Sequence, residues 1–153
     1  YIHSVSDISQ QFSFYMDGRF FTQYIKGNGA DVRNWGTLPK LDLTNTNLLL
    51  LDGGERRIPY SEKSITHIAE FVDSGGTVLI MANHATNGLA VLPLVEYFDG
   101  ALSDNKAQAP FTAAPSLAAQ DIEYYGGKTL AVSNTWTHLI KDKKGRPLLA
   151  RRQ

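Results

Sequence analysis

The chain has 153 residues, with 15 basic and 15 acidic side chains and no cysteine. A formal charge of zero, without a basic patch interleaved with aromatic residues, argues against nucleic acid as a partner. The missing cysteine excludes disulfides, a thiolate nucleophile and thiolate-bound metals, and no apolar run approaches the ~20 residues that span a bilayer. We expect a single α/β domain over residues 1–153, part of a longer protein because no initiating methionine precedes Tyr1.

The first third of the chain predicts a strand, a helix and a second strand. Residues 1–5 favour a weak strand, and residues 8–15 favour a loop or a short helical turn. Apolar and aromatic side chains at helical spacing predict a helix over residues 17–26, which ends at the glycine-asparagine-glycine sequence of residues 27–29. Val32 then alternates with polar neighbours, as in an edge strand.

The central part of the chain has the pattern of a βαβ unit. Four leucines at residues 48–51 and the apolar run at residues 77–82 predict strands covered on both faces, which is typical of parallel sheets. Between them, Ser61 favours the start of a helix and Gly75-Gly76 favours its end. Apolar residues of this helix share one face: Ile65, Ile68, Ala69 and Val72. We expect both strands to lie side by side in the middle of the sheet.

The remaining residues predict a second helix, a loop and a β-rich end. After an Asn87-Gly88 turn, Pro93 fits the first turn of a short helix. Residues 101–120 lack periodicity, which predicts a long loop or lid. Beyond them, residues 139–140 are expected to pair with residues 148–150 across a turn. The basic residues of this end are interpreted as solvated turns: Lys141, Lys143, Lys144, Arg146, Arg151 and Arg152.

A candidate ligand site follows from the two central strands. A right-handed crossover brings their carboxyl ends to one edge of the sheet, where open α/β sheets bind ligands. The candidate ligand-binding residues follow these strand ends: Asp52, Gly53, Gly54, Glu55, Arg56, Asn83, His84 and Thr86. His84 could bind a ligand or act as an acid or base, and it could also join Asp52 and Glu55 as a metal set. Alternatively, Asn83 and His84 only cap the next element.

Several segments resemble a class I glutamine amidotransferase-like domain. They are residues 47–52, the helix that starts at Ser61, residues 71–76 with the strand to Asn83-His84, the helix from Pro93 to Phe98, and residues 145–151. The resemblance covers nearly all of the chain and is most specific at residues 71–76, a packing motif. It implies a three-layer, flavodoxin-like α/β domain with a mainly parallel central sheet, ahead of the β-rich C-terminal part.

The same resemblance shapes the expected function. Active members place a catalytic cysteine where this strand runs into Asn83-His84, so glutamine hydrolysis by that route is excluded here. Trehalose-utilisation-like members are similar in carrying a histidine near this position, which supports a role for His84. We expect a non-catalytic binding or interaction module, an accessory domain of a larger bacterial protein such as one that handles polysaccharides. Its partner would be a small molecule or an adjoining domain, with no cofactor, metal or catalytic residue. The alternative is a small hydrolase in which His84 acts with Asp52 or Glu55.

Overall fold

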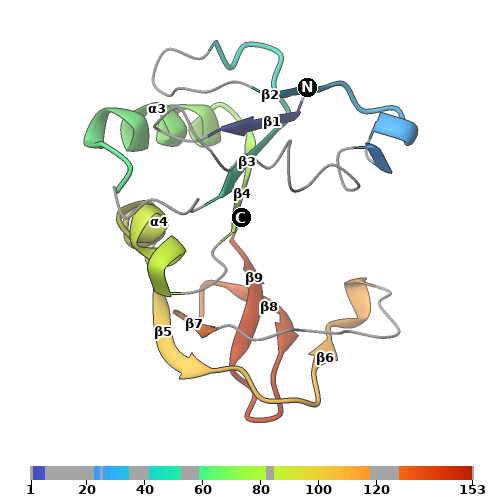
Figure 1. Cartoon of the computed structure of the whole chain (residues 1–153), viewed down its shortest axis with the longest axis vertical. Coiled ribbons are helices and arrows are strands. Elements are labelled where there is room, and N and C mark those ends of the chain that lie inside the picture. The colour runs from blue at the N-terminus through green and yellow to red at the C-terminus, as the bar shows by residue number, and fades with distance from the viewer. Residues whose placement is uncertain are drawn as a thin grey trace. The chain divides into compact units, whose positions relative to one another are not determined.

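The computed structural model of the chain describes residues 2–5, 23–24, 26–34, 42–52, 59–81, 85–117 and 128–152 (Figure 1). The chain divides into two compact units. Unit 1 comprises Tyr1–Ala82 and Thr86–Leu94, and unit 2 comprises Asn83–Ala85 and Val95–Gln153. Each unit has its own sheets, so each is described by itself.

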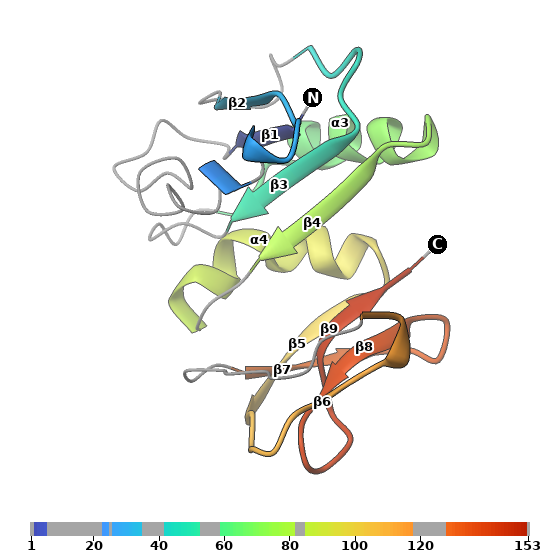
Figure 2. The same cartoon turned by 90° about the vertical axis from the view of Figure 1, so that its right-hand side faces the viewer.

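Unit 1 contains a four-stranded parallel sheet with the order β2-β1-β3-β4 (Figure 2). The strands are β1 (Ile2–Val5), β2 (Val32–Asn34), β3 (Leu48–Asp52) and β4 (Thr77–Met81). Strands β1 and β4 flank β3, and Leu49, Leu50 and Leu51 of β3 are at most 1% exposed. The prediction that β3 and β4 are adjacent parallel strands is confirmed. The prediction that both lie in the middle is wrong for β4, which is the outermost strand of the described sheet and is only half-buried.

Helix α3 (Glu62–Asp73) starts and ends where the sequence predicts. The Ser61 hydroxyl accepts a hydrogen bond from the Ser64 backbone N–H at 3.3 Å, which caps the helix. Ile65, Ile68 and Ala69 are buried, as the spacing predicts, whereas Val72 is only half-buried and Phe71 is buried in addition. The helix lies along one face of the sheet (Figure 2).

The turn from α3 into β4 is a Schellman motif. Gly75 has a φ of +95°, and its N–H donates to the Val72 carbonyl at 2.9 Å. The Gly76 N–H donates to the Phe71 carbonyl at 2.9 Å. The N–H of Thr77, the next residue and the first of β4, donates to the Asn47 carbonyl at 3.0 Å. The turn therefore delivers the chain from helix to strand without any intervening loop.

Helix α4 (Ala85–Tyr97) corrects two predictions. Pro93 lies inside this 13-residue helix instead of in its first turn, and Asn87-Gly88 is helical instead of forming a turn. Glycine and proline inside a helix cost about 1 and 3 kcal/mol relative to alanine. Burial opposes this cost, since Ala90, Val91 and Leu94 are at most 5% exposed. Within the described residues, no helix has both the length and the apolar character needed to cross a membrane.

Unit 2 consists mainly of antiparallel strands. Strands β5 (Gly100–Lys106) and β7 (Lys128–Val132) form one sheet. Strands β6 (Thr112–Ala113), β8 (Thr137–Lys141) and β9 (Pro147–Arg151) form the other, and a 3-10 turn, η1 (Pro115–Leu117), follows β6. The predicted β8–β9 hairpin is confirmed by the pairing of Ile140 with Leu149. The predicted loop at residues 101–120 is wrong up to Leu117, because β5, β6 and η1 occupy most of it; residues 118–120 lie outside the described part.

The predicted fold class is corrected by this arrangement. A three-layer, flavodoxin-like domain with a mainly parallel central sheet requires most strands in one sheet. In the described residues, four strands form the parallel sheet of unit 1, whereas five strands form two small antiparallel sheets in unit 2. The described part is therefore richer in β-structure than predicted. Of the N-terminal expectations, residues 23–24 and 26–27 are helical, and the rest of the predicted helix and residues 8–15 lie outside the described part.

Candidate functional site

The carboxyl ends of three parallel strands meet at one edge of the unit 1 sheet. Asp52, the last residue of β3, is the register partner of Met81, the last residue of β4. Val5, the last residue of β1, is the partner of Leu51. The segments that follow β1, β3 and β4 therefore leave the sheet at the same edge, as parallel pairing requires.

Most of the candidate ligand-binding residues lie outside the described part of the chain. Asp52 is described at the end of β3 and Thr86 in the first turn of α4, in both cases for the backbone alone. Gly53, Gly54, Glu55, Arg56, Asn83 and His84 are not described. Thr86 follows Met81 by five residues, so its Cα lies within about 18 Å of the end of β4. The grouping of these side chains into a site stays a prediction.

The alternative in which Asp52, Glu55 and His84 bind a metal ion stays a prediction, because Glu55 and His84 lie outside the described residues. Among the residues that the structure does describe, no three His, Asp or Glu side chains are placed to hold a metal ion.

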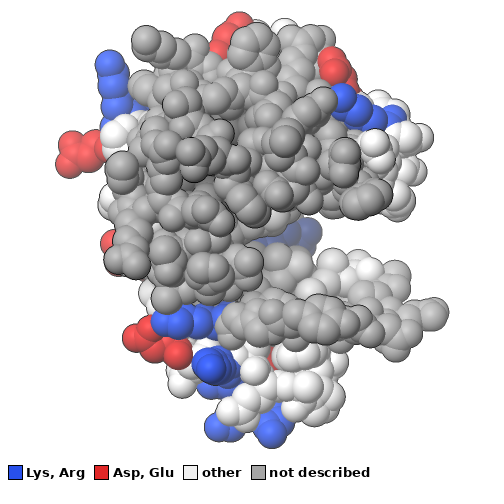
Figure 3. Space-filling view, viewed as in Figure 1, with Lys and Arg blue, Asp and Glu red and all other residues white. Residues whose placement is uncertain are grey.

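Unit 2 has an uneven distribution of charge that the sequence interpretation underrated. From Lys128 to Gln153 the sequence has seven Lys and Arg residues and a single acidic residue, Asp142. Figure 3 shows Lys and Arg side chains gathered over this unit at the lower end of the view. Of these cations, Lys128 forms an ion pair with Asp104 of β5, and Arg146 forms one with Asp142.

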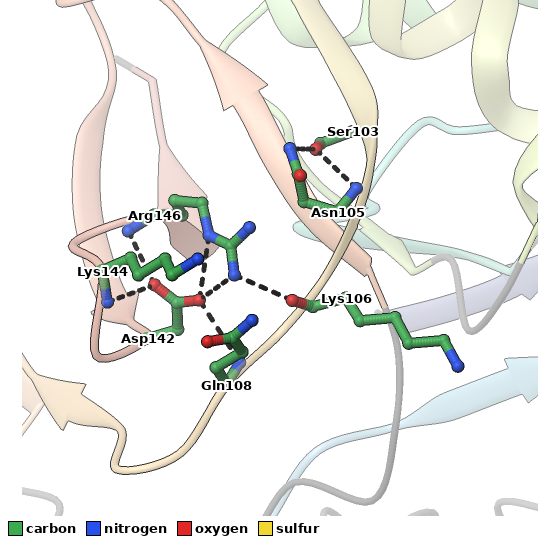
Figure 4. Close-up of polar contacts among 7 residues, drawn as sticks. All are labelled: Ser103, Asn105, Lys106, Gln108, Asp142, Lys144 and Arg146. Atoms are coloured by element: carbon green, nitrogen blue, oxygen red, sulfur yellow. Dashed lines mark hydrogen bonds and ion pairs between the residues drawn. The ribbon is translucent and has the colours of Figure 1, made fainter.

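Asp142 is the centre of a hydrogen-bonded cluster (Figure 4). Its side chain is fully buried. One carboxylate oxygen, Oδ1, accepts from the backbone N–H groups of Lys144 at 2.9 Å and Arg146 at 3.0 Å. The other, Oδ2, accepts from Arg146 Nε at 3.0 Å, from Arg146 Nη2 at 2.6 Å and from the Gln108 backbone N–H at 3.3 Å. Five donors therefore satisfy one carboxylate.

This cluster keeps Asp142 ionised. The hydrogen bond from the Arg146 side chain lowers the pKa of the Asp142 carboxyl to about 2, and the three backbone N–H groups add to this against the opposing effect of burial. A carboxylate with every oxygen occupied by internal donors has a structural role. Sequence reasoning missed the cluster, although an aspartate followed three residues later by Gly145, with a φ of +78°, is a recognisable turn signal.

These observations define a chain with a parallel sheet in one unit, small antiparallel sheets in the other, and no thiolate chemistry. The chain belongs to the family described as "Domain of unknown function (DUF4350)", whose family model matches residues 18–153. No curated protein matches the sequence. A solved structure described as "mmIFT52 N-terminal domain" is similar with a TM-score of 0.75 and 12% sequence identity, covering 98% of this chain and 83% of the other. At this identity the likeness shows the fold alone.

The resemblance to class I glutamine amidotransferase-like domains is corrected by these findings. The matching family is DUF4350, and the structural neighbour is the domain named above. The most specific part of the resemblance was residues 71–76. In the structure this segment is the Schellman turn in which Gly76 packs on Phe71, a solution open to any helix that leads directly into a strand.

Proposed function

We propose that this chain is a non-catalytic binding or interaction module that takes a small molecule or a segment of an adjoining domain at the carboxyl edge of the unit 1 sheet. The observation that carries the proposal is the register of the strands, since Asp52 lies opposite Met81 and Val5 opposite Leu51. Ligands of open α/β sheets bind where the carboxyl ends of neighbouring strands meet. In the sequence, carboxylate, guanidinium, amide and imidazole groups follow these ends.

The role of an accessory domain in a larger protein has separate support. The family is described as a domain, and the structural neighbour is named as an N-terminal domain, which is one part of a longer protein. The absence of cysteine from the sequence also removes the nucleophile that thiolate-based enzymes use. The polysaccharide context of the sequence analysis depended on the corrected resemblance and forms no part of this proposal.

The test is a ligand-observed NMR screen of a fragment library with the parent chain and with the double variant Glu55→Ala/His84→Ala. We expect hits of the parent to be lost in the variant while its Tm stays close to that of the parent, because ligand-facing loop residues contribute little to packing. The matched control is His67→Ala/Glu70→Ala, which changes the same residue types on helix α3. Binding should survive in this control.

Three outcomes would contradict the proposal. Unfolding of Glu55→Ala/His84→Ala would show that these residues are structural caps. Hits that persist in this variant would place binding elsewhere. Turnover of a hit by the parent, lost in the variant, would instead support the hydrolase alternative in which His84 acts with Asp52 or Glu55.

A further inference from the structure

Four exposed lysines lie at one end of unit 2. Lys106 ends β5, Lys141 ends β8, and Lys143 and Lys144 are in the turn between β8 and β9. We call these four residues the lysine tip. All four are exposed, and none of them forms an ion pair with another residue in the described part of the chain.

Two hydrogen bonds hold the backbone segments of the lysine tip close together. Arg146 Nη2 donates to the Lys106 carbonyl at 2.8 Å, which ties the end of β5 to the β8–β9 turn (Figure 4). The Lys143 N–H donates to the Gln108 carbonyl at 2.9 Å. Lys141 is adjacent to the same turn in the chain. The four lysines therefore come from two segments that are distant in sequence and joined in space.

Among the described residues, the two acidic residues closest in sequence to the lysine tip are already paired. Asp142 lies within the turn itself, but it is buried and bonded to Arg146. Asp104, two residues before Lys106, forms an ion pair with Lys128. Neither of these two carboxylates is therefore left to compensate the lysines of the tip, although the whole chain is formally neutral.

We propose that the lysine tip docks on an anionic lipid surface. Its exposed cations are all lysines, which act as compact point charges, whereas bidentate recognition of carboxylates or base edges favours arginine. Residues 106–110 and 141–147 contain no aromatic side chain on which a base could stack. A cluster of basic residues is attracted to the negative surface potential of anionic lipids, and each Lys or Arg near the surface adds to this attraction.

The cluster around Asp142 has a defined part in this docking. It buries the acidic side chain and leaves the Arg146 side chain only 22% exposed, and it holds the backbone of the turn through three N–H groups. Within the described part of the chain, the side chains of the four lysines are exposed and form no ion pair, so they can meet headgroup phosphates. Electrostatic attraction of this kind weakens as salt shortens the screening length.

The test measures cosedimentation of the full chain with phosphatidylcholine vesicles that contain or lack phosphatidylserine. Each lysine near an anionic surface contributes about a fivefold change in partition coefficient. The variant Lys143→Gln/Lys144→Gln should therefore bind phosphatidylserine vesicles about 25-fold more weakly than the parent. The matched control is Lys26→Gln/Lys63→Gln, which removes two exposed lysines of unit 1 and changes the net charge equally. Its binding should stay within about twofold of the parent.

Both variants must have the same Tm as the parent. We expect this because glutamine keeps most of the side-chain stem and the Lys144 N–H still donates to Asp142. If Lys143→Gln/Lys144→Gln fails to fold, Lys106→Gln/Lys141→Gln replaces it with the same expected loss. Absence of parent binding to phosphatidylserine vesicles overturns the proposal. Equal losses in the tip variant and the control also overturn it. Tip-dependent binding to duplex DNA without binding to vesicles would assign the surface to nucleic acid instead.

Discussion

The substitution Gly76→Ala tests how tightly the turn between α3 and β4 is packed. A Cβ atom at Gly76 would lie 2.2 Å from Cζ of Phe71, and 2.4 and 2.5 Å from its two Cε atoms. Non-bonded carbon atoms rest at about 3.5–4.0 Å. The ring would therefore have to move by more than ~1 Å, and Phe71 is only 6% exposed.

The expected cost follows from this burial. Inserting a methyl group into a packed site costs about 1–3 kcal/mol, and the overlap with three ring atoms places Gly76→Ala near the upper end. We expect a loss of roughly 2–3 kcal/mol in the free energy of unfolding, which lowers Tm by roughly 5–10 °C for a chain of this length. Urea unfolding curves followed by circular dichroism measure the change.

A double-mutant cycle identifies the cause. Phe71→Leu removes the Cζ and Cε atoms that the new methyl group would meet, so Gly76→Ala should cost less than ~1 kcal/mol in the Phe71→Leu background. The matched control is Gly75→Ala, because nothing lies within 4 Å of its Cβ position and only its φ of +95° is unfavourable. That backbone cost, about 1–2 kcal/mol, should not depend on residue 71. Equal costs of Gly76→Ala in both backgrounds would refute the packing argument.

Two further predictions concern the core of unit 1 and the Asp142 cluster. Leu50→Asp should lower the free energy of unfolding by at least ~4 kcal/mol, because it buries an unpaired charge at a position that is 1% exposed; Leu89→Asp, at a position 45% exposed, is the control and should cost less than ~1 kcal/mol. A small effect of Leu50→Asp would show that β3 is not central. Asp142→Asn should lower Tm at neutral pH, and the Tm of this variant should fall less than that of the parent as the pH is lowered. The pKa of the Asp142 carboxyl falls from 3.8 to about 2 on folding, so its stabilisation is present above pH 3.8 and is lost as the pH falls through about 2. Melting curves between about pH 6 and pH 2 should show a steeper loss in the parent than in Asp142→Asn, and parallel curves would contradict this assignment.

The elements that the sequence predicts correctly are those whose signals are local. Ser61, the apolar face of α3 and Gly75-Gly76 determine one helix within 16 residues. The leucines of β3 form a run that is typical of a strand covered on both faces. The β8–β9 hairpin has its turn residues between two apolar pairs.

The elements that the sequence mispredicts depend on distant partners. Helix α4 continues through Gly88 and Pro93 because Ala90, Val91 and Leu94 are buried, and burial is a tertiary effect. Strand β5 has little alternation of its own and is defined by pairing with β7. The five donors around Asp142 include Gln108, which is 34 residues away. Most of the candidate site at the carboxyl edge remains a prediction from sequence, with the strand ends as its observed part.

The Asp142 cluster also changes how a protease would meet this protein. Lys143-Lys144-Gly145-Arg146 offers trypsin several basic residues in a surface turn, which is the usual place for a nick. Cleavage requires the segment to leave the turn and enter the protease extended, and the bonds from Asp142 to Lys144 and Arg146 must then break together. The rate of cutting at this turn would therefore follow the opening of the cluster, although the lysine side chains themselves are exposed.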